Sequence, residues 1–400
     1  MKKLMLLGGL RYLIPLIEEA HKMGIYVITA DYLPDNIAHK YSDEYCNVSI
    51  IDKEAVLAKA RELKIDGILS HAVDPGVTTA AYVAEQMGLP FQCSYEAACI
   101  LQDKSRFRKF LAEHGFNSPK AKGYDNAEEA LKDVDYFSWP IIVKPVDSAG
   151  SKGVTKVENK TDLPKAIETA LNASLSKNFV IEEFLDKVGA QSSTDVFTIN
   201  GKLVYPAYSD QLFDANAANP YTPAIEIWPS SMEHKYQDNL TNQLQRLFTL
   251  LNVKSGIYNV ECRVCSDGKA YIMEVSPRGG GNRIAELQDM ATGQSLIRNE
   301  IKKALGMPLN NITAPVYDGV WCNYILHTSE KGTLVSVDID PKFQEKHVRD
   351  IGLIAKPGDK VVPFTGANTS LGTLFLQFDS REELNQSLSN VSSWLSIRLQ

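Results

Sequence analysis

The sequence has little of what a membrane protein or a general nucleic-acid-binding protein needs. No apolar run approaches the ~20 residues of a transmembrane helix. Its 42 basic and 49 acidic residues give a net charge of −7 without a long basic run, which argues against general nucleic-acid binding. The start, MKKLMLLGGL, carries a short basic segment, but its apolar run ends at Gly8-Gly9. We therefore expect a first β-strand there rather than a signal peptide.

Cysteine is sparse, with six residues scattered along the 400. Cys262 and Cys265 form a C-x-x-C pair, but an odd offset along a strand points two side chains to opposite faces. This spacing argues against a redox pair or a zinc site. Two nucleotide fingerprints are also missing, because Gly8-Gly9 is not a complete dinucleotide motif and no G-x-x-x-x-G-K-[ST] loop occurs. We expect a reduced, cytoplasmic protein without an NAD site or a P-loop.

A predicted hairpin at residues 258–282, YNVECRVCSDGKAYIMEVSPRGGGN, carries two glutamates in strands that otherwise look buried. Asp267-Gly268 is a strong hairpin-turn signal. The expected pairs are Cys265–Ala270, Arg263–Ile272 and Glu261–Glu274. Alternation then gives one apolar face with Val260, Cys262, Val264, Tyr271, Met273 and Val275. The other face places Glu261 directly opposite Glu274, with Cβ atoms roughly 4.5–5.5 Å apart.

Like charges in this position repel each other unless something relieves them. A shared proton, a basic neighbour such as Arg263, or a divalent cation could do so. One or two carboxylates together with substrate phosphates are the ligands that Mg²⁺ prefers. The alternative is a solvated hairpin face with scattered charge, and the hairpin alone leaves both interpretations open.

The first ninety residues alternate between strand and helix patterns, which predicts a parallel sheet with right-handed crossovers. We expect helices at about 12–23, 53–63 and 76–87. Ligands bind at the carboxyl ends of such strands, where this sequence has Gly8-Gly9, Asp31, His71 and Asp74. For His71 and Asp74 the alternative is a loop and helix-start role, since Pro75 follows Asp74.

The remaining chain is less regular. Further helices are expected at about 163–171, 234–251, 296–305 and 382–395. Residues 210–231 are rich in Pro, Asn and Ala and aperiodic, which is typical of a mobile loop. A Gly/Ser segment at 147–153 follows Lys144 on a strand end, and its backbone N–H groups and hydroxyls suit phosphate oxygens. Taken alone, such a segment can equally be a simple turn.

As an ordered set, these features resemble the carboxylate–amine ligase branch of the ATP-grasp superfamily. The matching segments are QDKSRFRKFL, WPIIVKPVDSAGSKGV, FVIEEFL and NVECRVCSDGKAYIMEVSPRGGG. The resemblance covers about residues 1–310 and extends to L-amino-acid ligases, purine-biosynthesis ligases and biotin carboxylases. It implies an α/β and α+β fold: a Rossmann-like domain at 1–95, an ATP-grasp domain of two α+β subdomains at 96–310, and a β-rich C-terminal domain at 311–400. The lid subdomain would span about 120–190.

The resemblance also assigns roles to individual residues. The residues implied to bind ATP are Lys104, Lys144, Ser148, Gly150, Ser151, Gly153, Glu182, Glu183, Phe184, Leu185 and Gln191. Those implied to hold Mg²⁺ or Mn²⁺ are Glu261, Glu274 and Ser276. Lys144 and Arg278 would act on the transferring phosphoryl group, and the expected substrate contacts are Arg283, Gly280, Asp74 and His71. Arg283 could instead be a surface arginine.

Two positions depart from the family pattern. Gln191 stands where glutamate is common, and amide hydrogen bonds to ribose hydroxyls remain available to it. Ser276 stands where asparagine is common, although EVSPR resembles the formate-using purine transformylases.

The resemblance implies a ligase that activates a carboxylate as an acyl phosphate and transfers it to an amine, releasing ADP and phosphate. The alternatives are an enzyme acting on formate or bicarbonate, and a nucleotide-binding module without catalysis. We expect small-molecule partners, no nucleic acid, no membrane, and a homodimer.

Overall fold

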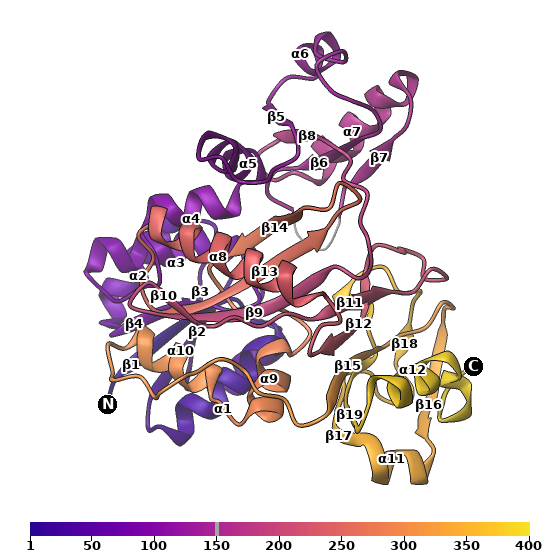
Figure 1. Ribbon diagram of the computed structural model, residues 1–400. Helices are drawn as coiled ribbons and strands as arrows, with labels where there is room; N and C mark the ends of the chain where they lie inside the picture. The colour runs from indigo at the N-terminus through magenta and orange to yellow at the C-terminus, as the bar shows by residue number, and fades with distance from the viewer. Residues whose placement is uncertain (149–151) are drawn as a thin grey trace.

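The computed structural model describes residues 1–148 and 152–400. Three lobes surround a central sheet, with the lid at the top of Figure 1 and the two chain ends in the lower lobes. This architecture confirms the mixed α/β and α+β class. No helix in the described ranges is long and apolar enough to cross a membrane.

The N-terminal lobe is built on a parallel sheet of order β3-β2-β1-β4. Its strands are β1 (Lys3–Leu7), β2 (Tyr26–Asp31), β3 (Glu44–Asn47) and β4 (Gly67–Ser70). The helices are α1 (Ile14–Lys22), α2 (Lys53–Leu63) and α3 (Asp74–Met87). The strands of this sheet are aliphatic and buried, as the sequence predicted. A distant helix, α10 (Leu296–Ala304), also packs here, with Ile297 and Ile301 in the core around α1.

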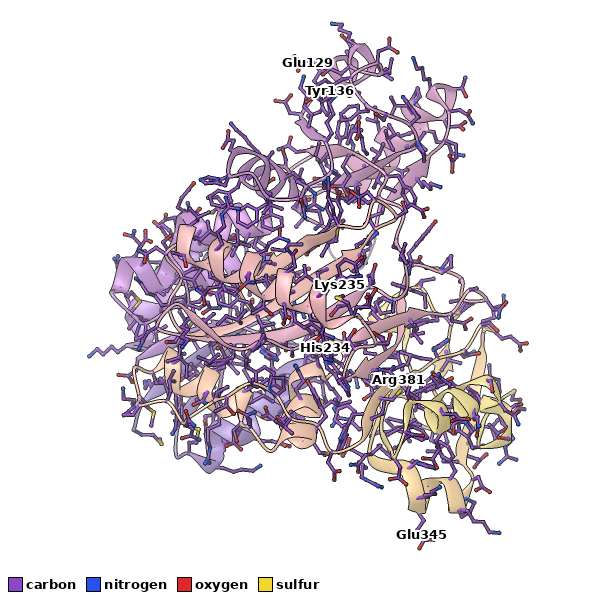
Figure 2. All side chains as sticks on the ribbon, viewed as in Figure 1. Glu129, Tyr136, His234, Lys235, Glu345 and Arg381 are labelled. Carbon is purple, nitrogen blue, oxygen red and sulfur yellow. The ribbon has the colours of Figure 1, made fainter. Side chains whose placement is uncertain are left out.

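The lid is an antiparallel sheet of order β5-β8-β6-β7. Its elements are β5 (Ala121–Tyr124), α6 (Ala127–Lys132), β6 (Ile141–Pro145), β7 (Thr155–Val157), α7 (Leu163–Ala173) and β8 (Phe179–Glu183). Glu129 and Tyr136 mark its outer end in Figure 2. Two helices, α4 (Tyr95–Gln102) and α5 (Lys104–Glu113), connect the N-terminal lobe to the lid.

The central sheet has the order β10-β9-β13-β14 and is antiparallel. Its strands are β9 (Ser192–Ile199), β10 (Lys202–Tyr205), β13 (Gly256–Val264) and β14 (Ala270–Ser276). Helices α4, α5 and α8 (His234–Leu250) bury one face of β13 and β14 in a common apolar core. The opposite face is therefore free to carry polar side chains.

The C-terminal lobe contains two antiparallel sheets, of orders β11-β12-β15-β19-β17 and β18-β16-β20. The first holds β11 (Asp210–Phe213), β12 (Pro223–Trp228), β15 (Val320–Leu326), β17 (Val348–Leu353) and β19 (Gly372–Phe378). The second holds β16 (Gly332–Ile339), β18 (Lys360–Val361) and β20 (Leu395–Leu399). The helices are α11 (Pro341–His347) and α12 (Arg381–Ser389). Arg381 at the start of α12 is labelled in Figure 2. Its Nη1 forms an ion pair with Asp210 Oδ2 at 3.1 Å.

The structure corrects three expectations. Residues 210–231 are not wholly a loop, because β11 and β12 form there. Their partner β15 lies about a hundred residues later, so local periodicity could not reveal the pairing. The last predicted helix ends at Ser389, and the chain finishes in β20. A further helix, α9 (Ile284–Thr292), begins directly after the glycine run and was not predicted.

Candidate active site

Glu261 and Glu274 are direct cross-strand partners, as predicted. The register near the turn differs, because Val264 pairs with Ala270 and Arg263 pairs with Tyr271. A bulge restores the expected alignment, since Glu261 faces Glu274 while Cys262 faces Ile272. The extra residue is Met273. Burial first, and then the charge of Glu274, raise the pKa of Glu261.

The same bulge makes the predicted apolar face partly wrong. Beyond it, the parity of β14 changes, because one extra residue shifts every side chain to the other face. Ala270 and Ile272 therefore join the core instead of Tyr271 and Met273. Val260, Cys262, Val264 and Val275 lie in the core as expected.

Arg108 holds the bulge in place and was missed by the sequence analysis. Its Nη1 donates to the Met273 carbonyl at 2.9 Å, and its Nε donates to Glu182 Oε2 at 2.8 Å. Lys144 Nζ lies 2.5 Å from the other oxygen, Glu182 Oε1. Arg108 follows Lys104 by four residues on α5, so helical spacing could have suggested a shared face.

Glu182, Arg108 and Lys144 form a buried triad of one acid and two bases in direct contact. Burial disfavours the carboxylate of Glu182, but Arg108 and Lys144 outweigh it and lower its pKa to about 2. Burial lowers the pKa of Lys144 to about 8, with Glu182 opposing the shift. The phosphate-binding role of Lys144 stays a prediction.

Lys104 joins the lid to the acidic hairpin. Its Nζ donates to the Ser148 carbonyl at 3.0 Å and lies 3.4 Å from Glu274 Oε2. Burial opposes its charge, but Glu274, Asp74 and Glu261 raise the pKa of Lys104 overall. The predicted phosphate contacts Gly150 and Ser151 lie outside the described residues.

The remaining nucleotide-binding predictions fall along the edge between lid and central sheet. Gly153 packs tightly, since a Cβ there would lie 2.5 Å from Ala173 Cβ. Glu183 accepts from the Ser138 N–H at 2.8 Å, and the Phe184 N–H donates to Pro140 at 3.0 Å. Leu185 follows them directly. Their adenine-binding roles stay predictions.

Gln191, the predicted ribose contact, lies in a buried amide network. Its Oε1 accepts from Arg263 Nη2 at 2.9 Å, and its Nε2 donates to Gln211 Oε1 at 2.6 Å. A hydroxyl ligand would have to share these bonds, so its ribose role also stays a prediction.

Arg278 and Asp74 form a two-pronged ion pair at the start of α3. Arg278 Nε and Nη2 donate to the two oxygens of Asp74 at 2.8 and 2.7 Å. Ser276 Oγ donates to Asp74 at 3.3 Å and accepts from Gln102 at 2.5 Å. Asp74 therefore lies beside the end of β14, and its role as a substrate contact stays a prediction.

The glycine run fits closely over two buried polar groups. A Cβ at Gly279 would lie 2.0 Å from His71 Cε1, so only glycine fits there. His71 is buried, its Nδ1 has no hydrogen-bond partner among the described residues, and burial lowers its pKa to about 3. The Gly280 N–H donates to Asp195 Oδ1 at 2.7 Å. Asp195, a second missed residue, is buried, and desolvation raises its pKa to about 7.

Arg283 occupies a strained position, with Asn282 and Arg283 at φ +52° and +64°. Its side chain is 23% exposed, and its guanidinium contacts Glu286, Asp350 and Thr373 at 3.0, 2.6 and 3.3 Å, while its role as a substrate contact stays a prediction. It thereby ties the glycine run to β17 and β19. Arg283 also lines a cavity of about 220 Å³ between the N-terminal lobe and the C-terminal lobe.

The donor set fits a cation that shares its ligands with a nucleotide. No group of three or more His, Cys, Asp or Glu side chains suited to a metal occurs in the described ranges. Glu261 and Glu274 alone provide two carboxylates, and phosphate oxygens and waters would complete the shell. Ser276 is already engaged by Gln102 and Asp74, so its direct ligation stays a prediction.

Sequence comparison identifies the central part of the chain. Residues 137–286 match the ATP-grasp domain. The chain thus contains an ATP-grasp domain. The match begins in the lid and ends within α9, so it includes the acidic hairpin, Arg278 and the glycine run.

Individual relatives of this chain differ in length. It is 25% identical over 220 residues to the carbamoyl phosphate synthase large chain of Thermoanaerobacter sp. (strain X514), covering 55% of this chain and 20% of that one. It is 24% identical over 359 residues to the formate-dependent phosphoribosylglycinamide formyltransferase of Parasynechococcus marenigrum (strain WH8102), covering 89% of each. The chain thus spans about a fifth of the length of the first relative.

Solved structures share the whole fold at low identity. The L-amino acid ligase from Bacillus licheniformis superposes with a TM-score of 0.81 at 20% identity, covering 100% of this chain and 99% of that one. The biotin carboxylase domain dimer of the Hydrogenobacter thermophilus 2-oxoglutarate carboxylase, in complex with MgADP, superposes with a TM-score of 0.74 at 15% identity. This match covers 99% of this chain and 91% of that one. At these identities the likeness establishes the ATP-grasp fold.

Proposed function

We propose that this protein is an ATP- and Mg²⁺-dependent ligase that joins a carboxylate to an amine and releases ADP and phosphate. One observation carries the proposal. Glu261 and Glu274 face each other across the hairpin, with Lys104 at 3.4 Å from Glu274. Arg278 stands four residues further on, anchored to Asp74. Acidic side chains that suit a cation thus lie close to basic side chains that suit phosphate.

In this proposal, the nucleotide lies between the lid and the central sheet. Lys104 and Lys144 would bind its phosphates, and the 147–153 segment, including Ser148, Gly150, Ser151 and Gly153, would lie over them. The segment from Glu182 to Leu185 would contact the adenine, and Gln191 the ribose. Mg²⁺ or Mn²⁺ held by Glu261 and Glu274 would neutralise phosphate charge. Positioning and charge neutralisation are the main demands of phosphoryl transfer.

The chemistry proceeds in two steps. A substrate carboxylate oxygen attacks the γ-phosphorus of ATP, forming an acyl phosphate while ADP leaves. The lone pair of the uncharged amine nitrogen then attacks the acyl carbon, the C–N bond forms, and the carbon–oxygen bond to phosphate breaks, while the nitrogen loses one proton and phosphate leaves. Arg278 would stabilise negative charge on the transferring group. The Asp74 pair fixes its guanidinium plane in advance.

In this proposal the cavity of about 220 Å³ beside this centre receives the substrates. Its lining combines two arginines, Arg11 and Arg283, with two acids, Glu18 and Glu286, and with the apolar side chains of Ile14 and Leu353. A smaller hollow beside it is lined by His71 and Gly280. Charges of both signs beside apolar side chains suit a small zwitterion that also carries an apolar group.

The test is ADP release from ATP and Mg²⁺ with a panel of L-amino acids offered as carboxylate and amine. Wild-type protein should form ADP only when both substrates are present, or form hydroxamate when hydroxylamine replaces the amine. Glu274→Gln should abolish turnover while the protein stays folded. Tight MgATP binding without ADP under every condition would instead support a non-catalytic nucleotide-binding module.

A second candidate acts on formate or bicarbonate through formyl phosphate or carboxyphosphate. The relative aligned over 89% of both chains is a formate-dependent enzyme, which favours including these acids. ATPase activity that requires formate or bicarbonate, and not amino acids, would select this alternative.

We further propose a cytoplasmic homodimer acting on small molecules. The six cysteines are free, which suits a reducing compartment. Light scattering on the purified chain tests the dimer directly, and a monomer at micromolar concentration would refute it.

A further inference from the structure

Arg11 is a cation without an acidic partner in the cavity in which we place the substrates. It begins the short 3-10 turn η1 (Arg11–Leu13), which leads directly into α1, and it lines the cavity of about 220 Å³. Within residues 1–148 and 152–400, its guanidinium makes no hydrogen bond or ion pair. Partial desolvation lowers the pKa of Arg11, and Tyr12 opposes this shift. The residue is exposed, so an anion that enters the cavity can reach it.

The other arginine that lines this cavity is already engaged. Arg283 Nη2 lies 2.9 Å from Glu286 Oε1, and its Nη1 lies 2.6 Å from Asp350 Oδ2. Burial raises the pKa of Glu286, Arg283 opposes the shift, and the charges of Asp350 and Glu18 add to it. Negative charge thus gathers around Arg283. A further carboxylate in the cavity is therefore repelled by these acids and attracted by Arg11.

The cavity continues towards the reaction centre. Tyr12 and Arg283 line both this cavity and the smaller hollow, whereas Gly280 lines the hollow alone. Gly280 follows Arg278, the residue proposed to stabilise the transferring phosphoryl group, by two positions. Arg11 lines the larger cavity alone. A substrate with its reacting end in the hollow would therefore extend towards Arg11.

The two steps of the proposed reaction leave one carboxylate unused. The first step converts the carboxylate of the acyl donor into an acyl phosphate. In the second step, a carboxylate on the amine substrate takes no part in the chemistry and stays ionised. The nitrogen must lose a proton and present its lone pair, so it cannot be held as an ammonium group. A cation that binds the carboxylate instead anchors the amine substrate and leaves its nitrogen free to react.

We propose that Arg11 binds the free carboxylate of the amine substrate, and that this substrate is therefore an amino acid. Two parallel N–H groups of a guanidinium match the two oxygens of a carboxylate. The protein thereby selects amino acids over the corresponding carboxamides, which have a similar shape and no charge at this end. This inference rests on the proposed ligase function and assigns nothing to its carboxylate-activating half.

The test compares an amino acid with its own carboxamide as the amine substrate. The amino acid is the one from the panel that gives the highest wild-type rate, and the coupled product is measured at a saturating concentration of the acyl donor. Amidation also changes the basicity of the nitrogen, so each substrate is compared between wild type and variant. Arg11→Gln should raise the KM for the amino acid about 10- to 100-fold and leave that for the carboxamide within about twofold. Arg11→Lys keeps the charge without the two-pronged geometry, so it should recover part of this loss.

Hydroxylamine separates this role from activation of the acyl donor. In Arg11→Gln, hydroxamate formation and its KM for the acyl donor should stay within about twofold of wild type. Arg61→Gln is the matched control, because it makes the same change of charge at an exposed arginine on α2, outside the lining of the cavity. Arg61 also has no ion pair in the part of the chain that the structure describes. This variant should leave every one of these constants unchanged.

Three results would overturn the carboxylate anchor. The first is a folded Arg11→Gln with an unchanged KM for the amino acid. The second is an equal rise for the amino acid and its carboxamide, or a rise in the KM for the acyl donor. The third is a wild type that forms hydroxamate but uses no amino acid as amine. Absence of hydroxamate from wild-type protein overturns the proposed ligase function instead.

Discussion

Arg108 Nη1 lies 2.9 Å from the carbonyl oxygen of Met273, the residue that the bulge in β14 leaves without a partner on β13. The same guanidinium binds Glu182, which also holds Lys144. One buried arginine thus connects the strand proposed to contact adenine, the lysine proposed to bind phosphate, and the residue that sets the register of Glu274. Placement of the acidic pair therefore depends on a residue outside the hairpin.

We expect Arg108→Lys to weaken Mg²⁺ activation more than it weakens folding. Lysine keeps a charge for Glu182 but cannot reach the Met273 carbonyl at the same time. The Mg²⁺ concentration for half-maximal ADP formation should rise about tenfold, measured by titration at saturating ATP. Arg106→Lys on the same helix is the control, because Arg106 is exposed and pairs with Glu96 at the surface. Equal Mg²⁺ titrations for both variants would contradict the role given to Arg108.

Arg108→Gln should destabilise the protein more severely. It removes one partner of a nearly buried carboxylate, which typically costs about 3–5 kcal/mol. Because Lys144 remains beside Glu182, the lower end of that range is expected. Urea denaturation measures the difference, and a loss below about 1 kcal/mol would show that Lys144 alone satisfies Glu182.

Glu261→Gln separates stability from activity. The variant removes a partly buried charge opposite Glu274, so the melting temperature without metal should stay equal or rise. ADP formation should fall at least about a hundredfold, because one of two carboxylate ligands is lost. MgATP should raise the wild-type melting temperature and leave that of the variant nearly unchanged. A variant that is both active and stabilised by MgATP would remove Glu261 from the metal site.

The sequence predicted the hairpin register at the two acids, but it did not predict the bulge that produces this register. Cross-strand pairing of Glu261 and Glu274 followed from Asp267-Gly268 and strand alternation. The bulge at Met273 depends on Arg108, more than a hundred and fifty residues earlier, and no local pattern encodes that contact. The prediction near the turn was wrong for this reason, although the pairing of the acids is confirmed.

Non-local pairing also hid the strands β11 and β12. The segment around Glu226 looked aperiodic because β12 finds its partner in β15 of the C-terminal lobe. By contrast, helices such as α2 and α8 were predicted almost to the residue, since their apolar spacing is local. Sequence alone thus located the chemistry-bearing motifs, while the contacts that orient them required the fold.

The buried Asp195 predicts how stability depends on pH. Its folded pKa, about 7, lies above the ordinary aspartate value near 4, so the folded state binds a proton more tightly than the unfolded state. The stabilisation is complete below about pH 4 and is lost as pH rises towards 7. Asp195→Asn keeps an acceptor for Gly280 and Asn259 and carries no charge.

Relative to Asp195→Asn, the wild type should lose on the order of 4 kcal/mol of unfolding free energy between pH 4 and pH 8. Urea denaturation of both proteins across this range, without nucleotide or metal, gives the difference directly. Parallel stability curves for the two proteins would place the titration of Asp195 outside this window.

Gly279 and Gly281 offer a matched pair for the glycine run. A Cβ at Gly279 would lie 2.0 Å from His71 Cε1, whereas a Cβ at Gly281 would meet no atom within 4 Å. The His71 ring is buried and cannot retreat freely, so Gly279→Ala must displace the turn and with it Arg278. We expect ADP formation to fall about a hundredfold in Gly279→Ala and by less than about threefold in Gly281→Ala. Combining Gly279→Ala with His71→Ala should restore much of the loss, because the second change removes the clashing ring. Failure of that double variant to recover would mean that the imidazole itself, and not its bulk, serves the turn.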